Sequence, residues 1–293
     1  MKILLTGATG FLGSHLLHAF LTNGYEVTIV KRSFSDTWRI NDVLNRVNSF
    51  NLDEVSLDTI FRESGHIDAV IHTATVYGKN NESIYSIEDS NVGFALNLLE
   101  KASFYNTDSF YNTDSSLGRF LNPYSISKGH FVEWGRYFAN NSRINFINIK
   151  LEHIYGEKDS SAKFVPYIID CCLRDVKYIE LTLGQQKRDF VHVSDVVNAY
   201  LCLLHHPQNG YSNYCVGSGR LITIKELVRY IHVSTNSKSK LLFGALPYRK
   251  NEIMCSCADL HPLLALGWKP CVEVKDGVLN LIKSIKKHGK EGD

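Results

Sequence analysis

The chain has 293 residues, of which 44% are hydrophobic and 21% charged, so it can bury a large core as one big domain or two smaller ones. Lysine and arginine total 32 and aspartate and glutamate total 30, a near balance that gives no general attraction to nucleic acid or to a membrane. No run of about 18 apolar residues occurs, and the N-terminus lacks signal-peptide features. The seven cysteines show no metal-ligand spacing, so we expect a reduced, cytoplasmic protein without a metal.

Strands and helices are expected to alternate along the first half of the chain. Strand patterns cover residues 2–7, 25–32, 67–74, 109–115 and 144–151, and helical spacing covers 11–24, 58–64, 91–104 and 123–141. This alternation predicts an α/β fold of the Rossmann type, with a doubly wound parallel sheet covered on both faces. From residue 152 onward the segments become shorter and richer in turn residues, which predicts a smaller, closely packed C-terminal α/β region.

The hexapeptide FYNTDS occurs twice in tandem, at 104–109 and 110–115. Two six-residue copies cannot build a repeat architecture. The first copy is expected to end the preceding helix and form a turn, since Asn, Thr, Asp and Ser favour turns. The second copy falls where the next strand should run, so identical sequences are expected to adopt different structures.

The stretch TGATGFLG lies between the first strand and the first helix and contains Gly7, Gly10 and Gly13. Glycines allow a tight turn and a close approach of a pyrophosphate to backbone N–H groups. The helix N-terminus adds positive potential. Because the triplet stands between a strand and a helix, it predicts a dinucleotide site.

The end of the second strand indicates which dinucleotide is bound. An acid there would hydrogen-bond the ribose 2′-hydroxyl of NAD, but the chain has Lys31 and Arg32 instead. Cationic side chains suit the 2′-phosphate of NADP, which we therefore favour over NAD; a merely solvated basic loop is the alternative.

The stretch NPYSISK places Tyr124 and Lys128 four residues apart on one face of a helix. A free tyrosine has a pKa of about 10, and a neighbouring ammonium stabilises the phenolate. We therefore expect Lys128 to lower the pKa of Tyr124 and also to hold the nicotinamide ribose.

Together with DAVIHTA, NVGFALNLLE, IYGEKD, RDFVHVSDV, YCVGSG and LGWKP, these motifs make the chain resemble the extended short-chain dehydrogenase/reductases of the nucleotide-sugar epimerase/dehydratase family over nearly its whole length. The resemblance implies that Ser115, at the end of a strand, hydrogen-bonds the reacting sugar oxygen. A shift of register would give that place to Thr113 or Ser116. The loop between this serine and Tyr124 is shorter than is usual in family epimerases, which puts the shape of the sugar pocket in question.

The resemblance also implies further binding residues. Arg188 would bind the substrate pyrophosphate, with a salt bridge to Asp189 or Asp195 as the alternative. His72 and His192 are expected to be structural, and His153 lies nearer the site. The residues expected along the cofactor are Phe11, Leu12, Asn51, Leu52, Thr73, Ala74 and Thr75.

The resemblance implies an NAD(P)-binding domain over 1–151 that also receives part of 188–206, a mainly substrate-binding region over 152–293, and a homodimer. We expect NADPH-dependent reduction of the 4-keto group of a nucleotide-activated deoxysugar, as in the bacterial reductases of CDP-4-keto-3,6-dideoxyhexoses in O-antigen (lipopolysaccharide) biosynthesis. An NAD-dependent nucleotide-sugar 4-epimerase is the first alternative. A non-catalytic NADP-sensing protein is the second, which an intact Ser115, Tyr124 and Lys128 argue against.

Overall fold

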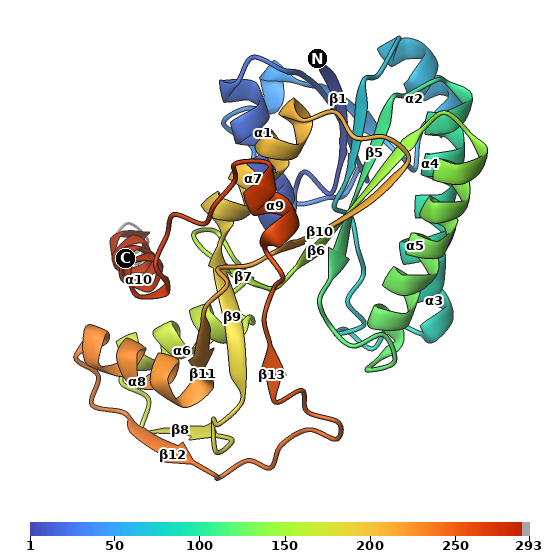
Figure 1. The fold of residues 1–293 in the computed structure, drawn as a ribbon. Helices are drawn as coiled ribbons and strands as arrows, with labels where there is room; N and C mark the ends of the chain where they lie inside the picture. The colour runs from blue at the N-terminus through green and yellow to red at the C-terminus, as the bar shows by residue number, and fades with distance from the viewer. Residues whose placement is uncertain (289–293) are drawn as a thin grey trace. The chain divides into compact units, whose positions relative to one another are not determined.

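The structure is a computed structural model that describes residues 1–288 (Figure 1). The chain forms two compact units, one of residues 1–150 with 200–214 and one of 151–199 with 215 onward. All seven cysteines are free thiols. Among the described helices, none is both long and apolar enough to cross a bilayer.

A seven-stranded sheet in the order β10-β6-β5-β4-β1-β2-β3 organises the first unit. The pairings of β1 with β2 and β4, of β2 with β3 and of β4 with β5 are parallel. The predicted Rossmann-type α/β fold is therefore confirmed. The strands are β1 (Lys2–Thr6), β2 (Glu26–Lys31), β3 (Asn48–Asn51), β4 (Ala69–His72), β5 (Ser109–Ser115), β6 (Asn145–Leu151) and β10 (Tyr211–Val216).

Helices cover both faces of this sheet (Figure 1). The face under α2, α4 and α5 carries an aromatic core in which Phe110 of β5 stacks on Phe146 of β6 at 5.6 Å and meets Phe131 of α5 at 5.8 Å. A Cβ atom on Gly135 would lie 2.2 Å from the Phe146 ring, so this glycine lets α5 approach the sheet. The helices are α1 (Phe11–Thr22), α2 (Leu57–Ser64), α3 (Ile84–Glu88), α4 (Phe94–Phe104), α5 (Pro123–Asn141) and α7 (Val193–His205), with a 3-10 turn at Leu44–Arg46.

The helix expected over 91–104 differs from the prediction. Its first turns form earlier, as α3, because the Ser83 hydroxyl accepts a hydrogen bond from the Ser86 N–H and caps that helix. A π-helical turn at Asp89–Gly93 then joins α3 to α4, and Asn91 lies inside it. A π turn leaves no signal in the spacing of apolar residues, and it is frequent at functional sites.

The tandem hexapeptide adopts the two predicted structures. Phe104 is the last residue of α4, and Asn106 turns the chain with a φ of 58°. The second copy lies within β5, which begins at Ser109. The prediction that context decides between helix end and strand is confirmed.

The second unit has a four-stranded sheet, in which β9 lies between β11 and β13 and also pairs with β7, and a two-stranded sheet of β12 and β8. Side chains of α6, α8 and α10 form its core around the buried Tyr155. Its elements are β7 (His153–Tyr155), α6 (Phe164–Leu173), β8 (Tyr178–Leu181), β9 (Lys187–His192), β11 (Leu221–Thr223), α8 (Ile224–Thr235), β12 (Lys240–Phe243), β13 (Cys255–Ser256), α9 (His261–Ala265) and α10 (Val274–His288).

Candidate active site

The glycine turn between β1 and α1 leaves no room for side chains. Gly7 has a φ of 72°, and a Cβ atom there would lie 2.6 Å from the Thr73 hydroxyl oxygen. A Cβ atom on Gly13 would lie 2.0 Å from the Gly7 carbonyl oxygen. The helix α1 starts at Phe11 with no acidic residue in its first turn. The backbone is thus exposed at a helix N-terminus, a geometry that fits the pyrophosphate of a dinucleotide.

The two cations at the end of β2 already have neighbours. The Lys31 ammonium donates to the Asn51 side-chain oxygen at 2.6 Å, and the Arg32 guanidinium lies 4.8 Å from the centre of the Phe34 ring. Asn51 ends β3, which pairs with β2 and brings the two residues together. The structure therefore places Lys31 and Asn51 side by side at one corner of the sheet, with Arg32 directly after Lys31 in the chain.

Two residues near this corner, Asp53 and Arg39, were not predicted from the sequence. Asp53 accepts a hydrogen bond from the Ser33 N–H at 2.8 Å, and Ser33 lowers the pKa of this carboxyl. Arg39 donates to the Thr9 carbonyl oxygen in the glycine turn at 3.4 Å. Asp53 follows β3 rather than β2, so a search for an acid at the end of β2 could not find it.

The segment after β4 closes over the glycine turn. The Thr73 hydroxyl donates to the Thr6 carbonyl oxygen at 2.8 Å, and the Ala74 N–H donates to the Thr6 hydroxyl. The Thr75 hydroxyl donates to the side chain of Asn91, which itself donates to the Ser127 hydroxyl at 3.0 Å. Asn91, which the sequence reasoning placed only at a helix start, thus joins this segment to α5.

The three predicted catalytic residues all belong to the first unit. Ser115 ends β5, while Tyr124 and Lys128 lie in the first turns of α5, which Asn122 caps through the Ser125 N–H. Burial raises the pKa of Tyr124, and a hydrogen bond with the Ser115 side chain opposes that rise. Ser115 thus lies near enough to Tyr124 to affect its phenol, while the Ser115 hydroxyl oxygen accepts a hydrogen bond from the Leu117 N–H at 3.2 Å.

Lys128 is buried, with 3% of its surface exposed. Burial lowers its pKa to about 8, and the charge of Asp114 offsets part of that shift. Within residues 1–288 its ammonium has no hydrogen-bond or ion-pair partner in the protein. The ammonium nitrogen is not among the fully enclosed, unpartnered polar atoms of the described residues, so a donor one helical turn from Tyr124 remains open to the hydroxyls of a nicotinamide ribose.

The expectation that Lys128 lowers the pKa of Tyr124 is wrong for this structure. The pKa of Tyr124 is raised, first by burial and then by Tyr77 and Asp114. Loss of hydration and nearby negative charge both disfavour the phenolate, and only the Ser115 side chain acts in the opposite direction. The phenol therefore keeps its proton at neutral pH, which suits a proton donor.

In the second unit, Arg188 pairs with a residue that was not expected. Its guanidinium donates to the Glu252 carboxylate at 2.5 Å, and its side chain is 8% exposed. Asp189 accepts from the Ser218 and Gly219 N–H groups, and Asp195 accepts from backbone N–H groups farther along the chain. The alternative of an Arg188 bridge to either aspartate is therefore wrong, because backbone donors occupy both carboxylates.

The three histidines considered in the sequence analysis have different surroundings. Burial lowers the pKa of His72 to about 3, and this neutral ring lies among Phe94, Phe110 and Phe131. His153 lies beside Glu152 at 3.5 Å, and His192 lies beside Glu157 at 3.3 Å.

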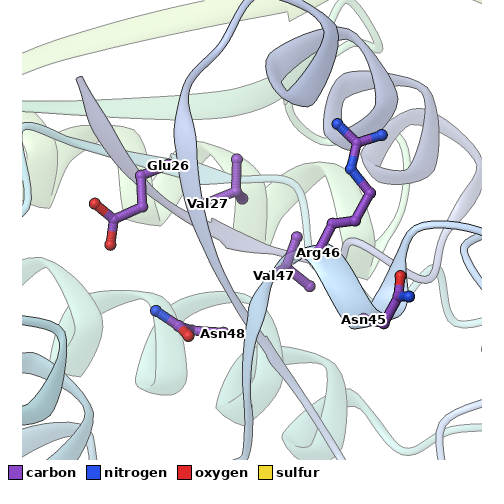
Figure 2. A pocket seen from close by; sticks show the side chains of 6 residues that line it. All are labelled: Glu26, Val27, Asn45, Arg46, Val47 and Asn48. Carbon is purple, nitrogen blue, oxygen red and sulfur yellow. The ribbon is translucent and has the colours of Figure 1, made fainter.

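A cavity of about 350 Å³ lies at the amino ends of two strands of the first unit's sheet, the end opposite to the glycine turn. Figure 2 shows its six lining residues, which come from the beginning of β2, the 3-10 turn and the beginning of β3. These are the amino ends of the strands, whereas the glycine turn follows a carboxyl end. Ligands of open α/β sheets bind at the carboxyl ends, so this cavity does not belong to the dinucleotide site.

The fold and the site define a Rossmann-type oxidoreductase of the short-chain dehydrogenase class. Residues 3–217 match the NAD dependent epimerase/dehydratase family. The chain is 39% identical over 294 residues to a protein named CDP-abequose synthase from Salmonella typhimurium, covering 97% of this chain and 98% of the relative. It is 36% identical to a CDP-abequose synthase from Salmonella muenchen, covering 96% and 97%. The chain therefore belongs to the NAD-dependent epimerase/dehydratase family, and the resemblance seen in the sequence is confirmed.

Two solved structures share the fold. The UDP-glucose 4-epimerase of Thermotoga maritima, solved with UDP-glucose, superposes with a TM-score of 0.88 at 23% identity and covers 98% of this chain and 99% of its own. The UDP-glucose 4-epimerase of Thermus thermophilus, solved with NAD, gives 0.85 at 20% identity and the same coverage. As a member of this family the chain is an enzyme that uses a nicotinamide dinucleotide.

The buried ammonium of Lys128 generates a stability prediction. Below pH 8 the lysine is charged in both the folded and the unfolded chain, so its full desolvation cost is present. Between about pH 8 and 10.5 the folded chain loses this proton first, and the cost falls. Lys128→Met should therefore raise the free energy of unfolding by roughly 3 kcal/mol at neutral pH, and by less at alkaline pH.

Urea unfolding of the purified, cofactor-free protein at several pH values measures this effect. Lys101→Met is a matched control, because Lys101 pairs with Asp58 near the surface of α4 and its pKa is raised. Destabilisation by Lys128→Met at neutral pH would contradict the buried, unpaired state of this lysine.

Proposed function

We propose that the protein catalyses NADPH-dependent reduction of the 4-keto group of a nucleotide-activated deoxysugar. The substrate is of the CDP-4-keto-3,6-dideoxyhexose type, used in O-antigen sugar biosynthesis in the cytoplasm. The observation that carries this proposal is the 39% identity to a CDP-abequose synthase over almost the full length of both chains. The partly buried Tyr124, whose pKa is raised, supports it, because a reductase needs a proton donor at this position.

The dinucleotide, when bound, supplies a hydride to C4 of the sugar. Tyr124 then donates its proton to the oxygen on C4 as that oxygen gains negative charge. Ser115, which lies near Tyr124, donates to the same oxygen and stabilises the developing charge. Lys128 binds the ribose hydroxyls and contributes a positive charge beside the reacting oxygen.

We assign the dinucleotide to the first unit and the nucleotide sugar mainly to the second. The glycine turn, Lys128 and the corner of Lys31 and Arg32 all belong to the first unit. Arg188 belongs to the second, and its guanidinium already holds a carboxylate in a nearly buried pair. A guanidinium group that binds a carboxylate can also bind a phosphate, because both present two oxygens to its planar N–H donors. We therefore assign the substrate pyrophosphate to Arg188.

A 4-epimerase that retains NAD is the competing function. The solved epimerases share the fold at 20–23% identity, which is well below the identity to the CDP-abequose synthases. A reductase consumes one NADPH for each sugar reduced, whereas an epimerase consumes none. Oxidation of NADPH in proportion to a CDP-4-keto-sugar therefore distinguishes the two.

The tandem hexapeptide offers a matched pair of variants for the catalytic assignment. Ser115→Ala should lower turnover by about two orders of magnitude, because it removes a donor to the developing oxyanion. Ser109→Ala, at the equivalent position of the first copy, should leave turnover nearly unchanged. Tyr124→Phe should be more damaging than Ser115→Ala, since it removes the proton donor. Single-turnover oxidation of NADPH with the keto-sugar measures all three.

Cofactor affinity is measured alongside turnover and should survive all three changes, because the glycine turn is intact. Loss of turnover in Ser109→Ala with normal turnover in Ser115→Ala would mean that the catalytic serine has been assigned to the wrong copy.

The preference for NADPH has its own test. The double change Lys31→Ala and Arg32→Ala should weaken NADPH binding by about tenfold or more, since two charged donors to a 2′-phosphate are lost. Binding of NADH should change little, and fluorescence titration with each cofactor measures the difference. Equal losses for both cofactors would argue against 2′-phosphate recognition at this corner.

A homodimer formed through the α4 and α5 faces is the proposed assembly. Trp134 and Tyr137 of α5 are exposed by 43% and 56%, whereas Phe131 is buried in the chain's own core and Phe138 packs against it. Only the first two are therefore available to a partner. Light scattering at micromolar concentration should show a dimer, and Trp134→Glu with Tyr137→Glu should give a monomer. A wild-type monomer would contradict the proposal.

A further inference from the structure

The second copy of the hexapeptide contains an acid, Asp114, that directly precedes Ser115. Asp114 is 7% exposed, whereas its counterpart Asp108 in the first copy is exposed. Its carboxylate accepts hydrogen bonds from the Ser115 N–H at 2.8 Å and from the Asn148 side chain at 3.1 Å. Both donors are neutral, so the buried negative charge is not neutralised by either of them.

The pleat of β5 determines which way this charge faces. Tyr111 and Thr113 face α7, where they hydrogen-bond with the Leu203 carbonyl and the Tyr200 hydroxyl. Phe110 faces the other way and packs on Phe131 of α5. Alternate residues of a strand share a face, so Asp114 lies on the side of α5, the helix that carries Tyr124 and Lys128.

Neutral amides lie beside this carboxylate. Asn148 of β6 also binds Asn112 and Asn213, and these three amides are neutral. Asp114 raises the pKa of both Tyr124 and Lys128, and so favours the protonated form of each. Within the described part of the chain, the titratable or charged groups around this place are Tyr124 and Lys128 from α5, Tyr77 from the segment after β4, His72 from β4, and Arg119, whose guanidinium donates to the Gly129 carbonyl of α5.

We infer that Asp114 is a positioning residue that keeps Lys128 charged and Tyr124 protonated, and thereby commits the site to donating a proton rather than accepting one. A reductase needs the donor form, whereas oxidation of a sugar alcohol needs the acceptor form. The inference rests on the proposed reductase function and adds to it the residue that sets the direction of proton transfer.

The test compares Asp114→Asn with Asp108→Asn, the same change in the other copy of the hexapeptide. Rates of NADPH oxidation with a CDP-4-keto-3,6-dideoxyhexose are measured from about pH 6 to about pH 10. Asp114→Asn should move the alkaline limb of the profile to lower pH by about one unit, because one buried charge near Lys128 is lost. Asp108→Asn should leave the profile in place. An unmoved limb in an active Asp114→Asn enzyme, or an equal movement in Asp108→Asn, would overturn the inference.

A second measurement needs no substrate and separates this inference from the proposed function. Without Asp114 the charge of Lys128 is buried with no compensation, so Lys128→Met should stabilise Asp114→Asn more than it stabilises the wild type. Should Asp114→Asn alone fail to fold, the double variant should fold. Equal stabilisation in both backgrounds, or a double variant that is unfolded as well, would show that the two residues are not coupled. If the wild type reduces no keto-sugar, the proposed function is refuted. The stability comparison of the single and double variants still tests whether Asp114 and Lys128 are coupled.

Discussion

The close contact between the glycine turn and the first helix is the constraint on which the nucleotide-binding unit depends. The Gly7 carbonyl lies where a side chain on Gly13 would begin. The segment after β4 closes on the same turn through Thr73 and Ala74. Because three backbone segments meet within van der Waals distance, no residue larger than glycine fits, and the N–H groups at the start of α1 stay accessible to an anion.

The proposed catalytic groups lie at the carboxyl end of β5 and in the first turns of the helix that follows it. β5 carries Ser115, and the short connection from it leads to the Asn122 cap that starts α5. One turn of this helix separates Tyr124 from Lys128. The π turn at Asp89–Gly93 adds Asn91, which ties the segment after β4 to α5. Hydrogen bonds to the backbone and to Ser127 therefore fix the helix that presents the proton donor.

Charge burial links stability to chemistry in this unit. Lys128 is charged at neutral pH although burial lowers its pKa to about 8. Asp114 on the adjoining strand offsets part of that cost and is itself held by neutral donors. An apolar residue in place of either would pack without this cost, but it would supply no charge beside Tyr124. The buried charges lower the stability of the folded unit but define the protonation states of Lys128 and Tyr124, as is common where function needs buried charge.

The sequence by itself determined the alternation of strands and helices in the first half of the chain, the glycine turn and the spacing of Tyr124 and Lys128, because these features depend on residues that are close in the chain. The short strand β3 and the helix α3 were not among the predicted elements. Periodicity of apolar residues and the conformational freedom of glycine are local properties. Only the tertiary structure decided that Asp114 faces α5, that Arg188 binds Glu252 rather than Asp189, and that burial raises the pKa of Tyr124. Those outcomes depend on which strands become neighbours and on how much water is excluded between them. No spacing along the chain encodes the loss of hydration around a side chain, so the sequence could not show that the pKa of Tyr124 is raised rather than lowered.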